Sequence, residues 1–328
     1  MTKCIERIDA ALEAALSPSG LSRGEALGLT AMGAPEEIVY LLARANMVRH
    51  SLVGDEIELC AIVNARSGRC TEDCAFCAQS GRHKTVIEIY PLLSVKKILE
   101  AAKAAQAQGV KRFSIVTSGR GIAPGPELDR IAEAIRGISE LGLSPCASLG
   151  LLDEAAAQIL REAGLVSYHH NLETSPNFYP EICSTHFFDQ RLRTVRLAKE
   201  YGFRLCSGGI IGLGESRADR VDLALTLRDL GVDSVPMNFL NPIPGTPLEN
   251  VPPLEPLEIL KTIAVYRLIM PRAAIRTCGG REQNLRGLQA LMFLAGANAT
   301  MTGNYLTTHG RRPEDDVQDI IDLGLKLK

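Results

Sequence analysis

The hydrophobic and polar positions follow two alternating patterns along most of the chain. Short apolar runs typical of buried strands, beginning with IELCAIV at 57–63 and RFSIVTS at 112–118, are separated by stretches with apolar residues every three or four positions, as in amphipathic helices. Helical stretches include 95–108, 128–141 and 189–201. Further strand-like runs lie at 143–150, 166–172, 203–212, 234–240, 273–278 and 298–303. Eight strands alternating with helices predict an α/β fold, a (β/α)8 barrel of the TIM type, with a doubly wound open sheet as the alternative.

Glycines and the two ends of the chain divide this pattern into parts. The first 17 residues, MTKCIERIDAALEAALS, have the spacing of an amphipathic helix, and Pro35 can begin another helix. We therefore expect an N-terminal helical segment at 1–50, the barrel at 51–308, and a charged loop with a closing helix at 309–328. Within the barrel, five glycines stand where a helix C-cap belongs, between a helical stretch and the next strand: Gly109, Gly142, Gly164, Gly202 and Gly231.

The composition excludes several classes of protein. Hydrophobic residues make up 46% of the 328 residues and charged residues 23%, which is typical of a globular protein with a core. The net charge of −2 offers no basic block for nucleic acid, and no apolar run approaches the length of a membrane span. The charged N-terminal stretch does not fit a signal peptide, so we expect a cytoplasmic protein. Nine cysteines, an odd number, indicate reduced thiols available for metal or catalysis rather than a disulfide framework.

The strongest chemical signal follows the first strand. In SGRCTEDCAFCAQSGR, Cys70, Cys74 and Cys77 have the spacing C-x3-C-x2-C. Three thiolates this close on a loop can each bind a different iron of a [4Fe–4S] cluster. The fourth iron then keeps an open coordination site, as a catalytic metal requires. A structural zinc site is the alternative, with His83 as the local candidate for a fourth ligand.

This motif resembles that of the radical S-adenosylmethionine (SAM) superfamily, in which an aromatic residue, here Phe76, precedes the third cysteine. The resemblance implies that Cys70, Cys74 and Cys77 bind the cluster, that the open iron binds SAM through its amino and carboxylate groups, and that Phe76 lies beside the adenine. In that superfamily, reduction of the cluster cleaves SAM to methionine and a 5′-deoxyadenosyl radical, while the protein positions and shields the reactants.

The chain from about residue 55 to the end is similar to the biotin synthase family. The similarity is carried by SGRCTEDCAFCAQS, YHHNLETSPNFYPEICSTHFFDQRL, RLCSGGIIGLGES, VPMNFLNPIPGTPL, IRTCGGREQN and LAGANATMTGNYLTT. It implies a sulfurtransferase in which two deoxyadenosyl radicals remove hydrogens from C9 and C6 of dethiobiotin. Sulfur from an auxiliary iron–sulfur cluster then enters between those carbons to form biotin. The similarity further implies an electron donor such as flavodoxin or ferredoxin, and a homodimer.

The same resemblance assigns the SAM and substrate sites. The glycine-rich segment GGIIGLGE, with Gly209 and Gly212, matches a strand end that lies along SAM. Glu173 matches an acidic residue that binds SAM hydroxyls, and Arg191 an arginine that faces the SAM carboxylate. For the substrate, the matching positions are Asn171, at the end of the fourth strand, and Asn238, which matches an asparagine that binds the dethiobiotin ring. Two positions depart from the family pattern, since asparagine and aspartate are usual where this chain has His169 and Glu173.

The auxiliary cluster site also departs from the pattern. In the common form of the family, three cysteines and an arginine hold a [2Fe–2S] cluster. Cys146, Cys206 and Arg276 match three of these positions, but the third cysteine is replaced by Ser114. A serine hydroxyl is a much poorer iron ligand than a thiolate. The usual set of ligands therefore lacks one cysteine thiolate.

Cys278 offers a replacement thiol. Residues i and i+2 of a strand share a face, so Cys278 points into the barrel if Arg276 does, roughly 7 Å further along. We therefore expect an auxiliary cluster on Cys146, Cys206 and Cys278, of four-iron type, with Arg276 as an occasional ligand or a neighbouring cation. The rival is a [2Fe–2S] site completed by Arg276 with Ser114 or Cys278. In a third interpretation, Cys278 is only a small buried hydrophobe.

Two other functions remain open at this point. One is a related radical SAM enzyme, a hydrogenase-cluster maturase or a mutase. The other is a non-catalytic iron–sulfur sensor or scaffold. Among the remaining cysteines, Cys60 is expected in the core, while Cys4 and Cys183 match no ligand position.

Overall fold

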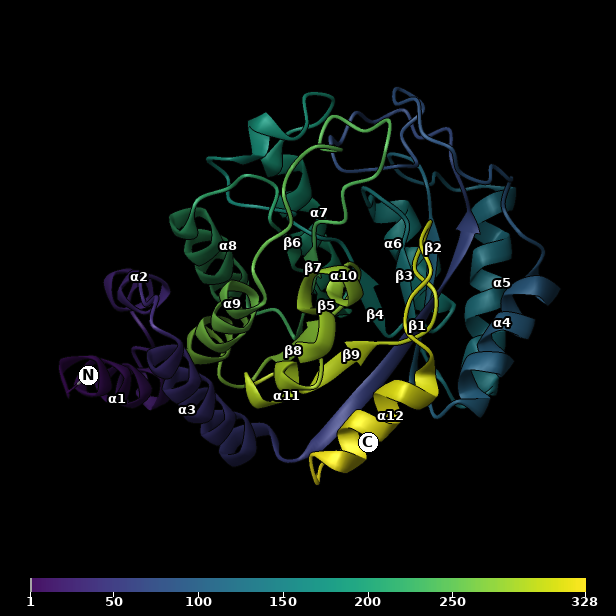
Figure 1. Ribbon diagram of the computed structural model, residues 1–328. Helices are drawn as coiled ribbons and strands as arrows, with labels where there is room; N and C mark the ends of the chain where they lie inside the picture. Colours follow the sequence, from purple (N-terminus) through teal and green to yellow (C-terminus); the bar gives the residue numbers. More distant parts are fainter. Residues whose placement is uncertain (1) are drawn as a thin grey trace.

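The parallel strands form one closed ring. The computed structural model describes residues 2–328 (Figure 1). β1 pairs with both β2 and β9, so the sheet closes on itself, which confirms the predicted barrel and shows the open sheet to be wrong. The strands are β1 (Glu56–Arg66), β2 (Arg112–Thr117), β3 (Ser144–Ser148), β4 (Ser167–His169), β5 (Arg204–Cys206), β6 (Gly209–Ile211), β7 (Ser234–Phe239), β8 (Ala274–Thr277) and β9 (Ala299–Met301).

The run predicted as one strand at 203–212 is divided into β5 and β6. Both pieces pair with β7. The backbones approach too closely here for side chains. A Cβ on Gly208 would lie 2.0 Å from the carbonyl oxygen of Pro236, and one on Gly209 would lie 2.3 Å from that of Glu173. β5 and β6 together are the fifth of eight barrel strands, interrupted where glycine lets neighbouring chains approach.

The helices cover the outside of the barrel (Figure 1). The three stretches predicted at 95–108, 128–141 and 189–201 are confirmed to within two residues. The five glycines expected at helix ends all have a positive φ, between 69° and 87°, which glycine adopts without strain. The helices of the barrel are α4 (Val95–Ala107), α5 (Pro126–Glu140), α6 (Glu154–Glu162), α7 (Phe188–Glu200), α8 (Arg217–Leu230), α9 (Pro256–Ile269), α10 (Arg281–Leu285) and α11 (Leu291–Leu294), with short 3-10 turns at Tyr179–Glu181 and Arg286–Leu288.

Three N-terminal helices pack beside the barrel: α1 (Thr2–Leu16), α2 (Arg23–Thr30) and α3 (Pro35–Val53). The expected amphipathic helix is confirmed from residue 2, while residue 1 lies outside the described part of the chain. Pro35 begins α3, as predicted. α3 packs on α9 and α2 on α8, so this segment extends the barrel's helical layer. Within residues 2–328, no helix combines the length and apolarity that crossing a bilayer requires.

The C-terminal segment returns to the first strand. The predicted closing helix is α12 (Pro313–Asp322), and it is followed by a strand that the sequence pattern did not predict, β10 (Lys326–Leu327), which pairs with the start of β1. A buried ion pair connects α12 to the first residue of α10. Nη2 of Arg281 donates to both carboxylate oxygens of Asp316 at 2.8 and 2.7 Å, and both side chains are fully buried.

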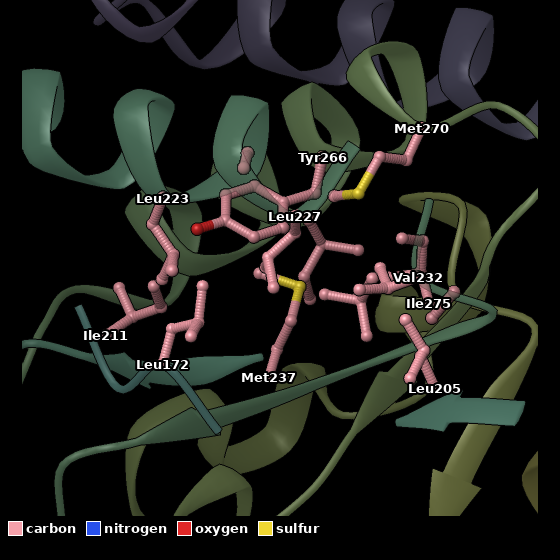
Figure 2. Close-up of a cluster of buried hydrophobic side chains, with 14 of the residues drawn as sticks. Leu172, Leu205, Ile211, Leu223, Leu227, Val232, Met237, Tyr266, Met270 and Ile275 are labelled. Carbon is pink, nitrogen blue, oxygen red and sulfur yellow. The ribbon is translucent and has the colours of Figure 1, made fainter. Parts of the chain in front are cut away.

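The apolar core lies between the strands and the helices rather than on the barrel axis. Figure 2 shows Leu205 of β5, Met237 of β7 and Ile275 of β8 packed with Tyr266 of α9 and side chains of α8. Because side chains alternate across a strand, the neighbours of these three residues in the sequence point into the barrel. The interior is therefore free to carry thiols and polar groups without disturbing the core.

Candidate active site

A cavity of about 320 Å³ occupies the barrel interior and opens where the strands end, the position of active sites in this fold. Its wall brings together ten of the residues that the sequence assigns to a site: Phe76, Cys77, Ser114, Cys146, Asn171, Glu173, Cys206, Asn238, Arg276 and Cys278. Five assigned residues lie outside this wall: Cys70, Cys74, Arg191, Gly209 and Gly212. Cys60, which the sequence placed in the core, is buried but also lines the cavity.

The cysteine loop lies over one end of the cavity. It begins after β1, and no helix intervenes before α4. The backbone of Cys70 is held by hydrogen bonds with Gln79 and Gly81, which folds the loop back on itself. Burial raises the pKa of the Cys77 thiol to about 11, although backbone N–H groups of the same loop lower it. An iron or another cation would be needed to keep this buried thiol ionised.

Cys74 turns toward a residue to which the sequence assigned nothing. Its Sγ lies 3.9 Å from that of Cys183, whose Sγ lies 3.2 Å from Nδ1 of His186. The ligand atoms of these three residues all fall within 4.8 Å of one another, and no other three histidine, cysteine or acidic residues within 2–328 come this close. The contact was not predictable, because the connection that carries Cys183 has no regular pattern.

The three loop cysteines fit an iron–sulfur cluster better than a single zinc ion. Sulfurs that share one tetrahedral zinc stand about 3.8 Å apart, given Zn–S bonds of about 2.3 Å. Cys70, Cys74 and Cys77 do not form such a tight group. Ligands that bind separate irons of a cubane stand further apart. Nε2 of His83, the candidate fourth zinc ligand, lies 3.1 Å from the backbone carbonyl oxygen of Cys74.

A polar network surrounds the end of β4. Arg191 donates to the backbone oxygen of Asn171 at 2.8 Å and lies 3.5 Å from Oε1 of Glu173, while Nδ2 of Asn171 donates to Oε2 of Glu173 at 3.3 Å. Burial lowers the pKa of Arg191, but Glu173 and Tyr179 outweigh it and raise the pKa, so the guanidinium stays charged. Glu173 has a φ of 71°, which is strained for a residue other than glycine and is typical of functional sites.

The glycine-rich strand end follows this network. The carbonyl oxygen of Glu173 accepts a hydrogen bond from the N–H of Ile210 at 2.8 Å, and Gly209 forms a bridge with Glu173. The N–H of Gly212, which has a φ of 97°, donates to the buried carboxylate of Glu215 at 2.9 Å. The backbone of this segment therefore packs directly on the backbone of Glu173, without an intervening side chain at Gly209.

Asn238 of β7 is held by the two neighbouring segments of the barrel wall, β6 and the turn after β8. Its Nδ2 donates to the carbonyl oxygen of Gly209 at 3.3 Å, and its Oδ1 accepts from the N–H of Gly279 at 3.1 Å. Tyr305, for which no motif predicts a role, lines the same region and donates to Glu282 at 2.7 Å.

The deep end of the cavity contains thiols and two arginines. Burial raises the pKa of Cys146 to about 12, although a hydrogen bond with Ser114 lowers it. Burial raises the pKa of Cys278 well above its usual range, and the neighbouring thiol of Cys60 raises it further. Nδ1 of His169 lies 3.3 Å from Sγ of Cys206, and burial lowers the pKa of His169 to about 4, so the imidazole is neutral.

One carboxylate orients both arginines. Glu58 accepts hydrogen bonds from Arg112, at 3.0 Å, and from Nη2 of Arg276. Burial raises the pKa of Glu58, but the two guanidinium groups outweigh it and lower the pKa to about 2. The Nη1 atoms of Arg112 and Arg276 are buried and have no hydrogen-bond partner within residues 2–328. Unpaired cationic donors beside several thiols suit an anionic group such as an iron–sulfur cluster.

The fold and the cysteine loop define a radical SAM enzyme. Residues 65–227 match the family model of the radical SAM superfamily, and residues 236–326 match that of the Biotin and Thiamin Synthesis associated domain. Among solved structures, methylornithine synthase superposes with a TM-score of 0.83 at 24% identity, covering 98% of this chain and 97% of that one. A maturase of the [FeFe]-hydrogenase superposes with a TM-score of 0.82 at 16% identity, covering 99% and 75%. These two similarities establish the fold alone.

Closer relatives identify the family. The biotin synthase of Trichlorobacter lovleyi is 52% identical over 321 residues, covering 98% of this chain and 96% of the relative. The biotin synthase of Pelobacter propionicus is also 52% identical, covering 93% of this chain and 93% of the relative. That of Geobacter sulfurreducens is 52% identical as well, covering 94% of each. The chain belongs to the biotin synthase family.

Proposed function

We propose that this chain is a biotin synthase that inserts sulfur between C6 and C9 of dethiobiotin. The observation that carries the proposal is the 52% identity to biotin synthases over nearly the whole length. It is supported by a single cavity that has a cysteine loop at one end and a group of thiols at the other. Two C–H bonds break and two C–S bonds form. The two hydrogen atoms leave in two molecules of 5′-deoxyadenosine, each from one SAM that takes up one electron from the donor. The sulfur would enter as sulfide from the auxiliary cluster, whose irons would take up the two electrons released when the C–S bonds form.

Cys70, Cys74 and Cys77 would hold a [4Fe–4S] cluster with SAM on its open iron. When bound and reduced, this pair supplies the 5′-deoxyadenosyl radical. The role of the chain is to position the reactants and to exclude water. Phe76 would cover the adenine, while Gly209 and Gly212 would let SAM approach the backbone. Glu173 would accept hydrogen bonds from SAM hydroxyls.

Arg191 would orient SAM through charge. Its guanidinium is buried and remains protonated, and the network with Glu173 and the Asn171 backbone fixes its direction. An arginine fork matches a carboxylate, so it would attract the carboxylate of SAM. Asn171 and Asn238 would bind dethiobiotin, whose ring carries both donors and acceptors. The cavity of about 320 Å³ is within the range of small-molecule sites.

Cys146, Cys206 and Cys278 would hold the auxiliary cluster that supplies sulfur, with Arg276 as a neighbouring cation or occasional ligand. A four-iron cluster fits better than a [2Fe–2S] cluster because the usual ligand position carries Ser114, whose hydroxyl interacts with Cys146. We further propose flavodoxin or ferredoxin as the electron donor and a homodimer as the assembly, since both accompany the family.

The test is a turnover assay without oxygen. The reconstituted chain, dethiobiotin, SAM and a chemical reductant should yield biotin and two equivalents of 5′-deoxyadenosine. Cys77→Ala should yield neither product, because the cluster loses a ligand. Formation of 5′-deoxyadenosine without any sulfur insertion would contradict the proposal and favour a maturase or mutase. A cluster that cleaves no SAM would favour a sensor or scaffold.

A further inference from the structure

We propose that Cys60 is a fourth thiol ligand of the auxiliary iron–sulfur site, together with Cys146, Cys206 and Cys278. The inference rests on the proposed function, because it assumes that an auxiliary cluster forms. It gives a role to a residue that the sequence pattern places in the core. Neither the cysteine motif nor the family resemblance assigns this residue.

The registers of neighbouring strands determine which inward side chains share a height. The strands of an eight-stranded barrel are tilted, with a shear of about 8. A residue at the same height on the next strand therefore lies about one position beyond the residue that is paired with it by hydrogen bonds. Each layer takes its four side chains from alternate strands. Cys60 of β1 is in register with Arg112 of β2, and Arg112 with Ser144 of β3. Two positions beyond Ser144 is Cys146, which therefore lies level with Cys60.

The same step continues around the barrel. We follow the paired residues across two strands and then move two positions along the chain. This leads from Cys146 to Cys206, from Cys206 to Arg276, and from Arg276 back to Cys60. The ring closes on the residue where it began, so the four side chains belong to one layer. We call this set of four the cysteine layer. Three of its four members are thiols, and the fourth is the arginine beside the proposed cluster.

Cys278 lies in the next layer of inward side chains from the same four strands, the first, third, fifth and seventh of the barrel (β1, β3, β5 and β8). It follows Arg276 by two positions on β8, so it faces the same way roughly 7 Å further along the strand. The three thiols of the cysteine layer and Cys278 line the same cavity, three of them in one layer and the fourth above the position of Arg276. A four-iron cubane takes one thiolate at each of its four irons, so four thiols around one cavity match its ligand number. Ser114 of β2 belongs to the intermediate layer, which the other four strands contribute at a height between Arg276 and Cys278.

The surroundings of Cys60 distinguish it from a structural cysteine. It is buried, yet it is not part of the main apolar cluster, which contains its neighbour Leu59. Leu59 faces the helices, so Cys60 faces the cavity. Arg276, the non-thiol member of the cysteine layer, already donates to Glu58 through Nη2. A guanidinium has no lone pair to offer while it is protonated, so Arg276 acts as a charge partner and the thiols remain as ligands.

The test isolates the auxiliary site. In a full-length chain with Cys70, Cys74 and Cys77 all replaced by alanine, iron bound after anaerobic reconstitution reports on the auxiliary cluster alone. Adding Cys60→Ala should reduce the iron per chain at least twofold and change the Mössbauer spectrum. The matched control is Cys4→Ala, which removes a thiol of α1 outside the barrel and should leave both readouts unchanged.

Each outcome decides a separate question. Unchanged iron and spectra with Cys60→Ala would overturn the inference and leave the three-thiol site in place. Absence of iron from the background chain itself would overturn the auxiliary cluster, and with it both proposals. Cys60→Ser provides the check on folding, since it keeps the volume and removes the thiolate. It should retain the wild-type urea midpoint of the apoprotein and show the same loss of iron as Cys60→Ala.

Discussion

Replacing Asp316 by asparagine should destabilise the protein by about 3–5 kcal/mol, the usual cost of removing one partner from a buried ion pair. Arg281 and Asp316 are both fully buried, and Nη2 of Arg281 donates to both carboxylate oxygens. Asparagine keeps the shape but leaves the guanidinium with only Glu282 as a counter-ion, whose Oε1 lies 3.6 Å from Nε of Arg281. The matched control is Asp315→Asn on the same helix, whose partner Arg312 is 77% exposed, so the loss should stay below about 1 kcal/mol.

The measurement is urea denaturation of the apoprotein, with the free energy of unfolding taken from the midpoint and the slope. A double replacement, Arg281→Met with Asp316→Leu, should be less destabilising than Asp316→Asn, because it removes both buried charges together. Equal losses for Asp316→Asn and Asp315→Asn would refute the reasoning. Arg281 follows Cys278 by three residues, so Asp316→Asn should also weaken iron retention at the auxiliary site.

Three further predictions concern the site and its support. Gly209→Ala should raise the Kd for SAM, measured by calorimetry, at least tenfold, because the new Cβ would lie 2.3 Å from the carbonyl oxygen of Glu173. Gly24→Ala, whose Cβ has open space, should leave this Kd unchanged. Asn238→Ala should raise the Kd for dethiobiotin by about 5- to 30-fold, the loss of about 1–2 kcal/mol of hydrogen bonding, while the Kd for SAM stays within twofold. Burial raises the pKa of Glu258, but cationic partners on α8 and α9 outweigh it and lower the pKa. The stability difference between wild type and Glu258→Gln should therefore be constant from about pH 7 to pH 5 and shrink below about pH 4.5, and a difference that grows on acidification would contradict this sign.

The barrel was predictable because its strands and helices each have a clear period. The glycines that end the helices have the expected positive φ, and Pro35 begins a helix. The break between β5 and β6 was not predictable, because it depends on how closely Pro236 approaches Gly208 in space. β10 was missed because a two-residue strand leaves no pattern in the sequence.

The parts of the site that form a local sequence motif were predictable. The parts that depend on the register between neighbouring strands were not. The cysteine loop and Arg276 were found from local spacing and family resemblance. Alternation within one strand was enough to relate Cys278 to Arg276. The relation between Cys60 and Cys146 depends on the pairing of β1 with β2 and of β2 with β3, which no single stretch of sequence contains.

The pairing of β1 with the end of the chain affects how the protein is made. β1 pairs on one side with β9 and at its start with β10, and about 230 residues separate β1 from β9. At about 5–20 residues per second, a ribosome needs roughly 10–50 s to supply the missing neighbours. During that interval the nascent β1 keeps an open hydrogen-bonding edge, which is prone to intermolecular pairing. The thiol of Cys60 is likewise exposed to the cell until synthesis is almost complete, so protection by chaperones and reductants would matter most before the barrel closes.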